Sequence, residues 1–328
     1  MVKMVKSLSN LKTIYIKDYK KFDKIDNTSF SKELKIELSK ENKKIPSKFK
    51  YDLNGSKYFE KITKLKEYYA TRTEKKILKQ ISKEMKNIFD NNLTFIEFGS
   101  GATDKISILI NDQVKFCMPL DISYDFLLKS SIKLAKSFPN LIIMPAYGDY
   151  INKFKLPKQI SKKRIGFFLG SSIGNFYKKK EKIFLQNART TLGKNGCLFV
   201  GVDLIKNKKI IEKAYNDSKG TTAKFNFNLL SRINKVFKTK LKQKDFKYFS
   251  HFNKKNNSVE SFLISKKDQK LIIDNKKFFV KKNEKIQTEI SNKFTLNSFK
   301  ILANLAGWKV KKYWIDKNKY YSIFLLEN

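Results

Sequence analysis

Short apolar runs alternate with longer stretches of helical spacing through the middle of the chain. The runs that predict strands are residues 94–98, 116–120, 141–145, 165–169 and 197–204. Between them, apolar positions recur at helical spacing in residues 105–110, 124–138 and 178–191. Apolar strands that alternate with crossover helices are typical of a parallel sheet covered by helices, so the pattern predicts an α/β fold.

A long amphipathic helix is predicted just before the first strand. Thr71 and Glu74 have the spacing of a capping box, in which each side chain bonds to a backbone N–H at the start of a helix. The apolar positions that follow at helical spacing are Ile77, Leu78, Ile81, Met85 and Ile88. We therefore expect the helix to begin at Thr71. Upstream, residues 1–49 are rich in lysine with weak helical spacing, and the extreme N-terminus is expected to be mobile.

The pattern changes after Leu204. Residues 210–237 have helical spacing, and residues 246–252, 258–265 and 271–280 have the character of antiparallel strands, which indicates a second lobe. The last stretch returns to the first pattern. It predicts a helix at 296–306 with Gly307 as its C-cap, followed by strands at 308–314 and 320–326.

The net charge changes this picture less than its size suggests. A charge of +41 over 328 residues, from 71 basic and 30 acidic side chains, first indicates a nucleic-acid or anionic-membrane partner. Only four of the basic residues are the arginines that suit phosphate best, namely Arg72, Arg164, Arg189 and Arg232. The lysines run through every segment together with Asn, Ile and Phe, the residues that AT-rich codons favour. We attribute the charge to this bias and predict no specific nucleic-acid partner.

The two cysteines indicate no metal site, and the sequence contains no recognisable targeting signal. Cys117 and Cys197 each lie in an apolar run, with no second Cys or His at metal-ligand spacing, so both are interpreted as buried thiols and no metal is expected. Residues 1–10 lack the apolar run of a signal peptide, and no stretch reaches the roughly 18 apolar residues of a membrane span. We expect a cytoplasmic protein without a membrane partner.

A glycine-containing loop follows the first predicted strand. It runs from Glu97 to Gly101, and its glycines at 99 and 101 allow the backbone to approach a ligand closely. A dinucleotide site would favour a third glycine where this chain has Asp104. S-adenosylmethionine has no pyrophosphate and carries a sulfonium and an ammonium. An acidic loop with glycines therefore suits this methyl donor better than a dinucleotide.

Two acidic residues follow the next two predicted strands. Asp121 lies about 20 residues after the loop, the spacing at which a carboxylate can accept both ribose hydroxyls. Asp149 follows the third strand, where the crevice at the carboxyl ends of parallel strands would hold the adenine. Taken singly, Asp121 could cap a helix and Asp149 could belong to an ordinary turn. In this order after three strands, the loop and the two carboxylates predict a site for S-adenosylmethionine.

Six ordered motifs resemble those of one enzyme family, and the resemblance covers nearly everything from Tyr51 to Asn328. They are residues 51–52 (YD) with 55–56 (GS), 67–74 (EYYATRTE), 97–101 (EFGSG), 167–176 (FFLGSSIGNF), 214–217 (AYND) leading to 222–226 (TAKFN), and 288–294 (TEISNKF). On these motifs the chain resembles the histidine-specific Nα-methyltransferases of ergothioneine biosynthesis. That family trimethylates histidine to hercynine with S-adenosylmethionine and without a metal.

The resemblance implies an α/β fold with a Rossmann-like class I methyltransferase domain and a second, substrate-binding α+β domain. On this basis residues 70–206 and 294–328 are expected to form the S-adenosylmethionine-binding domain, and residues 1–69 and 207–293 the substrate-binding domain. A small-molecule amino-acid substrate and a monomeric enzyme are also expected.

The same motifs imply roles for individual residues. Those that would face the methyl donor are Gly99, Lys105, Asp121, Asp149 and Tyr150. Those that would hold the carboxylate and amine of the amino acid are Tyr68, Asn175 and Tyr215, while Glu289 and Ser291 would hold its imidazole. Tyr51 would lie near the reacting nitrogen as the catalytic residue. Taken singly, each of these side chains also suits a structural role, such as a core aromatic or a solvated charge.

One position departs from the family and leaves the substrate open. Val259-Glu260-Ser261 stands where the family commonly has Ile-Glu-Met, and the smaller, polar Ser261 enlarges or wets the side-chain pocket. A tryptophan derivative is therefore the alternative substrate. Two alternative hypotheses remain. One is an RNA methyltransferase, which would share the loop that binds the nucleoside of the methyl donor. The other is a non-catalytic nucleic-acid-binding protein that merely keeps the methyltransferase fold.

Overall fold

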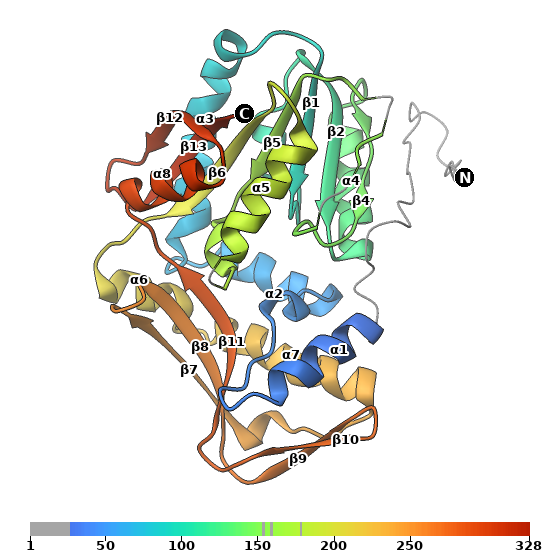
Figure 1. Ribbon diagram of the computed structural model, residues 1–328, viewed down its shortest axis with the longest axis vertical. Helices are drawn as coiled ribbons and strands as arrows, with labels where there is room; N and C mark the ends of the chain where they lie inside the picture. The colour runs from blue at the N-terminus through green and yellow to red at the C-terminus, as the bar shows by residue number, and fades with distance from the viewer. Residues whose placement is uncertain (1–26, 153–154, 158–159, 178) are drawn as a thin grey trace. The chain divides into compact units, whose positions relative to one another are not determined.

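The computed structural model describes residues 27–152, 155–157, 160–177 and 179–328 (Figure 1). The described chain forms two compact units: Ala70–Ile205 with Phe294–Asn328, and 27–69 with Lys206–Lys293. The first unit is thus discontinuous, because the chain leaves it after Ile205 and returns at Phe294. The sequence placed the boundaries between the two expected domains after residues 69, 206 and 293. The roles assigned to these domains, methyl-donor binding and substrate binding, stay predictions. The N-terminus that was expected to be mobile, residues 1–26, lies outside the described residues.

An eight-stranded sheet forms the centre of the first unit. Its strands are β1 (Leu93–Phe98), β2 (Val114–Asp121), β3 (Ile142–Ile143), β4 (Ala146–Tyr147), β5 (Arg164–Phe168), β6 (Cys197–Asp203), β12 (Lys309–Ile315) and β13 (Tyr321–Glu327). The order is β12-β13-β6-β5-β1-β2-β3, with β4 beside β2. Strands β1 to β6 pair in parallel, whereas β13 pairs antiparallel with both β6 and β12. The predicted α/β fold with a mostly parallel sheet is confirmed.

Helices cover this sheet and bury its apolar residues. They are α3 (Tyr69–Ile88), α4 (Tyr124–Ser137), α5 (Lys180–Leu192) and α8 (Leu296–Leu305). Helices α5 and α8 pack together in front of the sheet, and α3 runs behind it (Figure 1). The front layer holds a cluster of buried aromatic side chains, namely Phe98, Phe168, Phe184, Phe299 and Phe324. Because every residue of β1 and β6 is buried, these strands have continuous apolar character rather than alternation.

The capping box expected at Thr71 is wrong. Helix α3 begins at Tyr69, so Thr71 already lies inside its first turn. The Glu74 carboxylate is used elsewhere: Oε1 accepts hydrogen bonds from the Gly170 amide at 2.7 Å and from the Tyr321 hydroxyl at 2.6 Å. Tertiary partners therefore take the carboxylate that local spacing had assigned to the start of the helix.

Two further predictions in the first unit need correction. The strand expected at 141–145 is only β3 at 142–143, and a second short strand, β4, follows at 146–147, because Pro145 between them has no N–H for a strand ladder. The helix expected at 105–110 is only a 3₁₀ turn, η2 (Ile106–Ile108). Its β-branched isoleucines and short length do not favour a longer helix.

The second unit is an α+β arrangement with its own core. Its elements are α1 (Asn27–Leu38), η1 (Ser47–Lys50), α2 (Leu53–Thr63), α6 (Lys208–Tyr215), α7 (Thr221–Phe237), η4 (Gln243–Asp245), β7 (Phe246–Asn253), β8 (Ser258–Ser265), β9 (Gln269–Ile273), β10 (Lys276–Val280) and β11 (Lys285–Asn292). Strands β11, β8 and β7 form an antiparallel sheet in that order, and β9 pairs with β10. The core joins α1, η1, α7, β8 and β11 through Phe30, Phe49, Leu229, Leu263 and Ile286.

Three elements of the second unit differ from expectation. The helix predicted over 210–237 is two helices, α6 and α7, separated by a turn in which Gly220 has a φ of +65°. The strand predicted over 271–280 is the hairpin β9–β10, whose turn residues Asp274 and Asn275 both have positive φ. Strand β11 was not predicted as a strand. Among the described residues, no helix combines the length and apolarity that crossing a membrane requires.

Candidate active site

The glycine loop after β1 has the backbone geometry that its sequence suggested. Gly99 and Gly101 have φ values of +72° and +53°, in the left-handed region that favours glycine. The amides of Gly99 and Ser100 donate to the Leu120 carbonyl, which holds the loop against the end of β2. A Cβ added at Gly101 would meet no atom within 4 Å, so space lies open beside this backbone. The loop therefore provides a cradle that a ligand can approach.

Asp121, the last residue of β2, is bonded to this cradle. Its Oδ2 accepts the Gly101 amide at 2.9 Å, and its Oδ1 accepts the Ser123 amide at 2.9 Å. Burial raises the pKa of Asp121, and these backbone bonds oppose the rise. The N-cap residue of α4 is Ser123, so Asp121 does not cap that helix. Each carboxylate oxygen keeps further lone-pair capacity, which suits an acceptor for hydroxyl groups such as those of ribose.

We expect Asp121→Ala to weaken binding of S-adenosylmethionine by about 1.5–3 kcal/mol, the range for hydrogen bonds to a charged group. The variant loses both the proposed ribose acceptor and the bond that orders the Gly101 amide. Isothermal titration calorimetry measures the change. Asp104→Ala is the matched control, because its exposed carboxylate belongs to the same segment but pairs with Lys75. An Asp121→Ala affinity equal to that of wild type contradicts the assignment.

Buried charge lies around the same loop. Lys105 Nζ is 2.9 Å from Oε2 of Glu74, whose side chain is fully buried. Burial lowers the pKa of Lys105, but the charges of Glu74, Asp104 and Glu97 outweigh it and the net shift is upward. Glu97 Oε2 is buried without a hydrogen-bond partner among the described residues, and burial raises the pKa of this carboxyl well above its usual range. An unsatisfied buried acceptor next to an open backbone cradle fits a ligand that brings an ammonium group.

Asp149 and Tyr150 follow β4 near the same strand ends. The Gly148 amide donates to the Asp121 carbonyl at 3.0 Å, and Asp149 Oδ1 accepts the Ile151 amide at 3.1 Å. The Tyr150 ring would lie 3.2 Å from a Cβ at Gly99, so it forms a wall behind the loop. Burial raises the pKa of the Tyr150 hydroxyl, which stays protonated. The structure therefore brings together all five residues expected to face the methyl donor.

The residues expected to hold the amino acid are divided between the two units. Asn175 belongs to the first unit, where it ends the 3₁₀ turn η3 (Ser172–Asn175) after β5. This turn follows Gly170 and Ser171, which both have positive φ. Tyr51, Tyr68, Tyr215, Glu289 and Ser291 all belong to the second unit.

The three tyrosines lie in one aromatic cluster. Tyr51 contacts Phe59 edge-on with ring centroids 5.6 Å apart, and Phe59 contacts Tyr68 at 6.3 Å. Tyr68 in turn contacts Tyr215 edge-on at 6.5 Å. Asp52, directly after Tyr51, caps α2 by accepting the Gly55 amide at 2.8 Å. The Tyr-Asp-x-x-Gly pattern therefore caps α2, and the cap positions Tyr51 beside the first turn of this helix.

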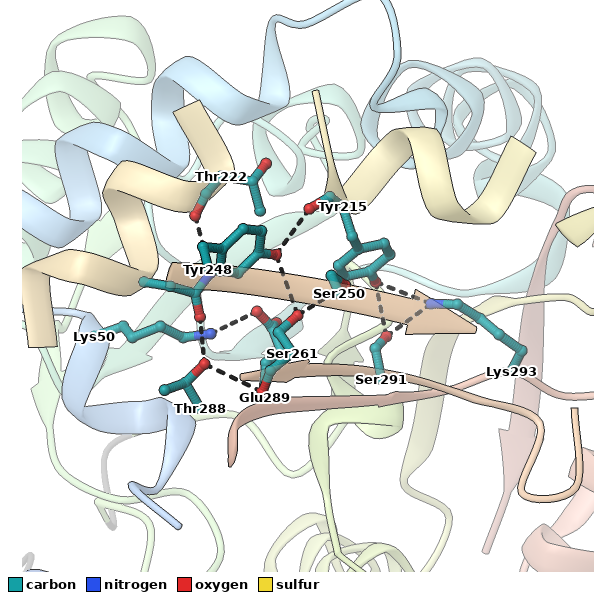
Figure 2. A network of polar contacts seen from close by, with 11 residues as sticks. Lys50, Tyr215, Thr222, Tyr248, Ser250, Ser261, Thr288, Glu289, Ser291 and Lys293 are labelled. Carbon is teal, nitrogen blue, oxygen red and sulfur yellow. Dashed lines mark hydrogen bonds and ion pairs between the residues drawn. The ribbon is translucent and has the colours of Figure 1, made fainter. Parts of the chain in front are cut away.

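Tyr215, Ser291 and Lys293 form one end of a polar network (Figure 2). The Tyr215 hydroxyl donates to Ser291 Oγ at 2.8 Å. Lys293 Nζ donates to Ser291 Oγ at 2.7 Å and to the Tyr215 hydroxyl at 2.9 Å. Because a serine oxygen has two lone pairs and one hydrogen, these two donors leave Ser291 its hydrogen to donate. Ser291 is therefore suited to a ligand atom that accepts a hydrogen bond.

Glu289 and Ser261 form the other end of this network (Figure 2). They are opposite each other in the register of β11 and β8. Ser261 Oγ donates to Ser250 Oγ at 3.0 Å and lies 3.2 Å from the Tyr248 hydroxyl, which donates to the Tyr215 carbonyl at 2.8 Å. Ser261, which departs from the family pattern, thus belongs to a chain of hydroxyl groups that reaches Tyr215. Glu289 Oε2 is bonded to Lys50 Nζ at 2.5 Å.

The geometry now allows comparison with known proteins. A family model described as "Histidine-specific methyltransferase, SAM-dependent" matches residues 30–328. The chain belongs to this family. The family's methyl donor is S-adenosylmethionine, in agreement with the cradle, the acidic loop and the unsatisfied Glu97 oxygen described above.

Individual relatives of this histidine-specific methyltransferase family agree over most of the chain. The "Histidine N-alpha-methyltransferase" of Mycolicibacterium smegmatis is 29% identical, over 87% of this chain and 90% of that protein. A protein of the same description from Mycobacterium tuberculosis is 28% identical, over 85% of this chain and 89% of that protein. The "Ergothioneine biosynthesis protein 1" of Neurospora crassa is 27% identical over 85% of this chain, which matches 32% of that protein.

Sequence reasoning missed three side chains of the polar network in the second unit. Lys50 precedes the Tyr51 motif directly, but a chain with so many lysines gives no signal that one of them is buried. Tyr248 had only strand character, and Lys293 was part of a motif without an assigned role. Among the described residues, no group of three or more His, Cys, Asp or Glu side chains could hold a metal ion.

Proposed function

We propose that this protein transfers methyl groups from S-adenosylmethionine to the α-amino nitrogen of L-histidine, up to the trimethylated product hercynine. The observation that carries the proposal is the pairing of Glu289 and Ser291 on one face of β11. Glu289 offers a carboxylate oxygen as acceptor, and Ser291 offers a hydrogen as donor. A neutral imidazole has one N–H and one bare nitrogen, so it satisfies both.

The residue roles in the proposal follow the chemistry of an in-line displacement. S-adenosylmethionine supplies an activated methyl group, so the protein has to align the amine and exclude water, with no covalent nucleophile. In the proposal Gly99, Lys105, Asp121, Asp149 and Tyr150 bind the methyl donor. Tyr68, Asn175 and Tyr215 hold the carboxylate and amine of the amino acid, and Tyr51 contacts the reacting nitrogen.

Neutral hydrogen-bond donors suit this reaction. Tyrosine hydroxyls and an asparagine amide can hold a carboxylate without adding a cation that would repel an incoming sulfonium. Deprotonation of the α-ammonium is helped by desolvation of the bound amine, because burial disfavours the charged form of an amine. The proposal places Tyr51 at the nitrogen for this step.

The proposal includes neither a metal nor a nucleic-acid or membrane partner, and we infer a monomer acting in the cytoplasm. We attribute the lysine excess to the amino-acid bias of the whole chain, because lysines occur in every segment rather than in one cluster. Some of them pair with surface carboxylates, as Lys64 does with Glu60, Lys86 with Asp112 and Lys163 with Asp90. Such exposed pairs contribute little to stability.

A tryptophan derivative remains the second candidate substrate because of Ser261. The hydroxyl groups of Ser250, Ser261 and Tyr248 make the surroundings of Ser261 polar, and this favours imidazole over a large apolar ring. An indole would bring a single N–H and no acceptor, so it would leave the Ser291 hydrogen unpaired.

An assay with purified protein and radiolabelled S-adenosylmethionine tests the proposal. We expect label in histidine, with mono-, di- and trimethylated products resolved by mass spectrometry, and no label in bulk RNA. Any binding to RNA should be weak and should fall steeply with salt. A higher kcat/KM for tryptophan than for histidine, or label transferred to RNA, contradicts the proposed substrate.

A further inference from the structure

Lys50 is a buried charged residue of the second unit to which the proposed function assigns no role. It ends η1 directly before Tyr51, and its side chain has no solvent exposure. Its Nζ is 2.5 Å from Glu289 Oε2 and lies over the Phe225 ring at 4.8 Å from the centroid. A lysine that is entirely buried is rare in proteins unless a partner holds it.

The backbone around Lys50 is held from several sides. Asn228 Nδ2, on α7, donates to the Lys50 carbonyl at 3.3 Å and to Asp52 Oδ1 at 2.8 Å. Arg232, one turn further along α7, donates to the Phe49 carbonyl at 2.9 Å. A Cβ at Gly55 would overlap the Lys50 carbonyl, so glycine is needed for α2 to approach η1 this closely. The direction of the Lys50 side chain is therefore built into the packing of η1, α2 and α7.

The pair of Lys50 and Glu289 has no net charge wherever its proton resides. Burial lowers the pKa of Lys50, and the attraction of Glu289 opposes that shift. If the proton stays on Lys50 the two charges cancel, and if it moves to Glu289 both groups are neutral. A lone buried Glu289 carboxylate would instead attract a cationic side chain. Lys50 removes that attraction.

We propose that Lys50 is a positioning residue that determines specificity: by neutralising Glu289 and occupying Oε2, it leaves Oε1 to accept one N–H from an uncharged side chain. The inference rests on the proposed function, and it adds that the pocket selects the neutral imidazole over the imidazolium. Lysine and arginine side chains are disfavoured on the same ground.

The other titratable groups of the network reinforce this preference (Figure 2). They are Tyr215 from α6, Tyr248 from β7 and Lys293 at the end of β11. Burial raises the pKa of Tyr248, so it contributes a neutral hydroxyl. Helix α7 contributes the uncharged Asn226, whose Oδ1 accepts from Thr288 at 2.8 Å. The network thus contains two lysines and one carboxylate, so a cationic side chain would find no excess of negative charge.

The dependence of the histidine KM on pH tests the inference. An imidazole with a pKa near 6.5 is about one-quarter neutral at pH 6 and almost entirely neutral at pH 8. If only the neutral form binds, the wild-type KM at pH 6 should be about fourfold higher than at pH 8. Protonation of the substrate amine affects all variants alike. Differences in the KM ratio between variants therefore report on how the pocket binds the imidazole.

A charge cycle of three variants separates this role from a merely structural one. Lys50→Met leaves Glu289 uncompensated, and the KM ratio between pH 6 and pH 8 should fall to about one or below. Glu289→Gln leaves Lys50 uncompensated, and the ratio should stay at about fourfold, because the neutral fraction of the free imidazole sets its upper limit. The double variant Lys50→Met/Glu289→Gln restores a neutral pocket and should return the ratio to that of wild type.

The outcomes distinguish failure of the inference from failure of the proposed function. A ratio in Lys50→Met equal to that of wild type overturns the role of Lys50. If that variant does not fold, as judged by thermal unfolding, a wild-type ratio of about one between pH 6 and pH 8 overturns the inference, because the pocket then accepts the imidazolium as well as the neutral imidazole. A wild-type enzyme that does not methylate histidine at any pH instead contradicts the proposed substrate.

Discussion

Glu74→Ala should lower the free energy of unfolding by about 3–5 kcal/mol, the usual effect of removing one partner from a buried ion pair. The variant leaves Lys105 without its buried counter-ion and removes the acceptor of the Gly170 amide and the Tyr321 hydroxyl. These groups belong to α3, the segment around η2, the turn after β5 and strand β13. Urea titration monitored by circular dichroism measures the loss.

Tyr321→Phe is the matched control for this prediction. It removes only the hydroxyl that donates to Glu74 and keeps the buried ring, so a loss of about 0.5–1.5 kcal/mol is expected. If the two variants lose the same stability, the Lys105 and Gly170 contacts contribute nothing. The prediction that Glu74 stabilises the first unit through all three contacts would then be wrong.

Glu289→Ala should lower kcat/KM for histidine by roughly 10- to 100-fold, equivalent to about 1.5–3 kcal/mol of lost recognition. The side chain that would accept the imidazole N–H is lost, and Lys50 is left buried and unpaired. Stability should therefore also fall, by about 3–5 kcal/mol. Steady-state kinetics at saturating methyl donor measures the first effect and urea titration the second.

Glu260→Ala provides the control for Glu289→Ala. Glu260 lies on the neighbouring strand β8, but its carboxylate accepts hydrogen bonds from Asn253, Asn256 and Ser258 rather than from Lys50. Its removal should leave kcat/KM for histidine close to that of wild type. An equal loss in both variants would mean that Glu289 acts only through the stability of the sheet.

The sequence predicted β1, β2, β5 and β6 of the first unit because buried parallel strands are continuous apolar runs. It failed where tertiary contacts or single residues decided the outcome. The Thr71 cap was wrong because Gly170 and Tyr321, far away in sequence, take the Glu74 carboxylate. The hairpin β9–β10 was taken for one strand, although the polar pair Asp274 and Asn275 between two apolar runs is a recognisable turn signal.

The arrangement of residues around the glycine loop could be predicted better than the polar network of the second unit. Gly99, Asp121 and Asp149 follow successive strand ends, and a parallel sheet brings such positions together by topology alone. Lys50 and Glu289 are far apart in sequence and meet only through the packing of η1 on β11. No local pattern distinguishes a buried lysine from the many solvated ones, so this pair required the structure.

The position of β13 between β6 and β12 has a consequence for synthesis on the ribosome. Strand β6 emerges early, but its neighbour β13 is translated only after the whole Lys206–Lys293 segment, α8 and β12. Until then β6 is an apolar edge whose unpaired backbone groups can bind other chains, which is a known route to aggregation. Most of the second unit is translated after Ile205, yet it can complete its core before β13 completes the sheet of the first unit. We therefore expect nascent chains that stall before Tyr321 to depend on chaperones that shield strand edges.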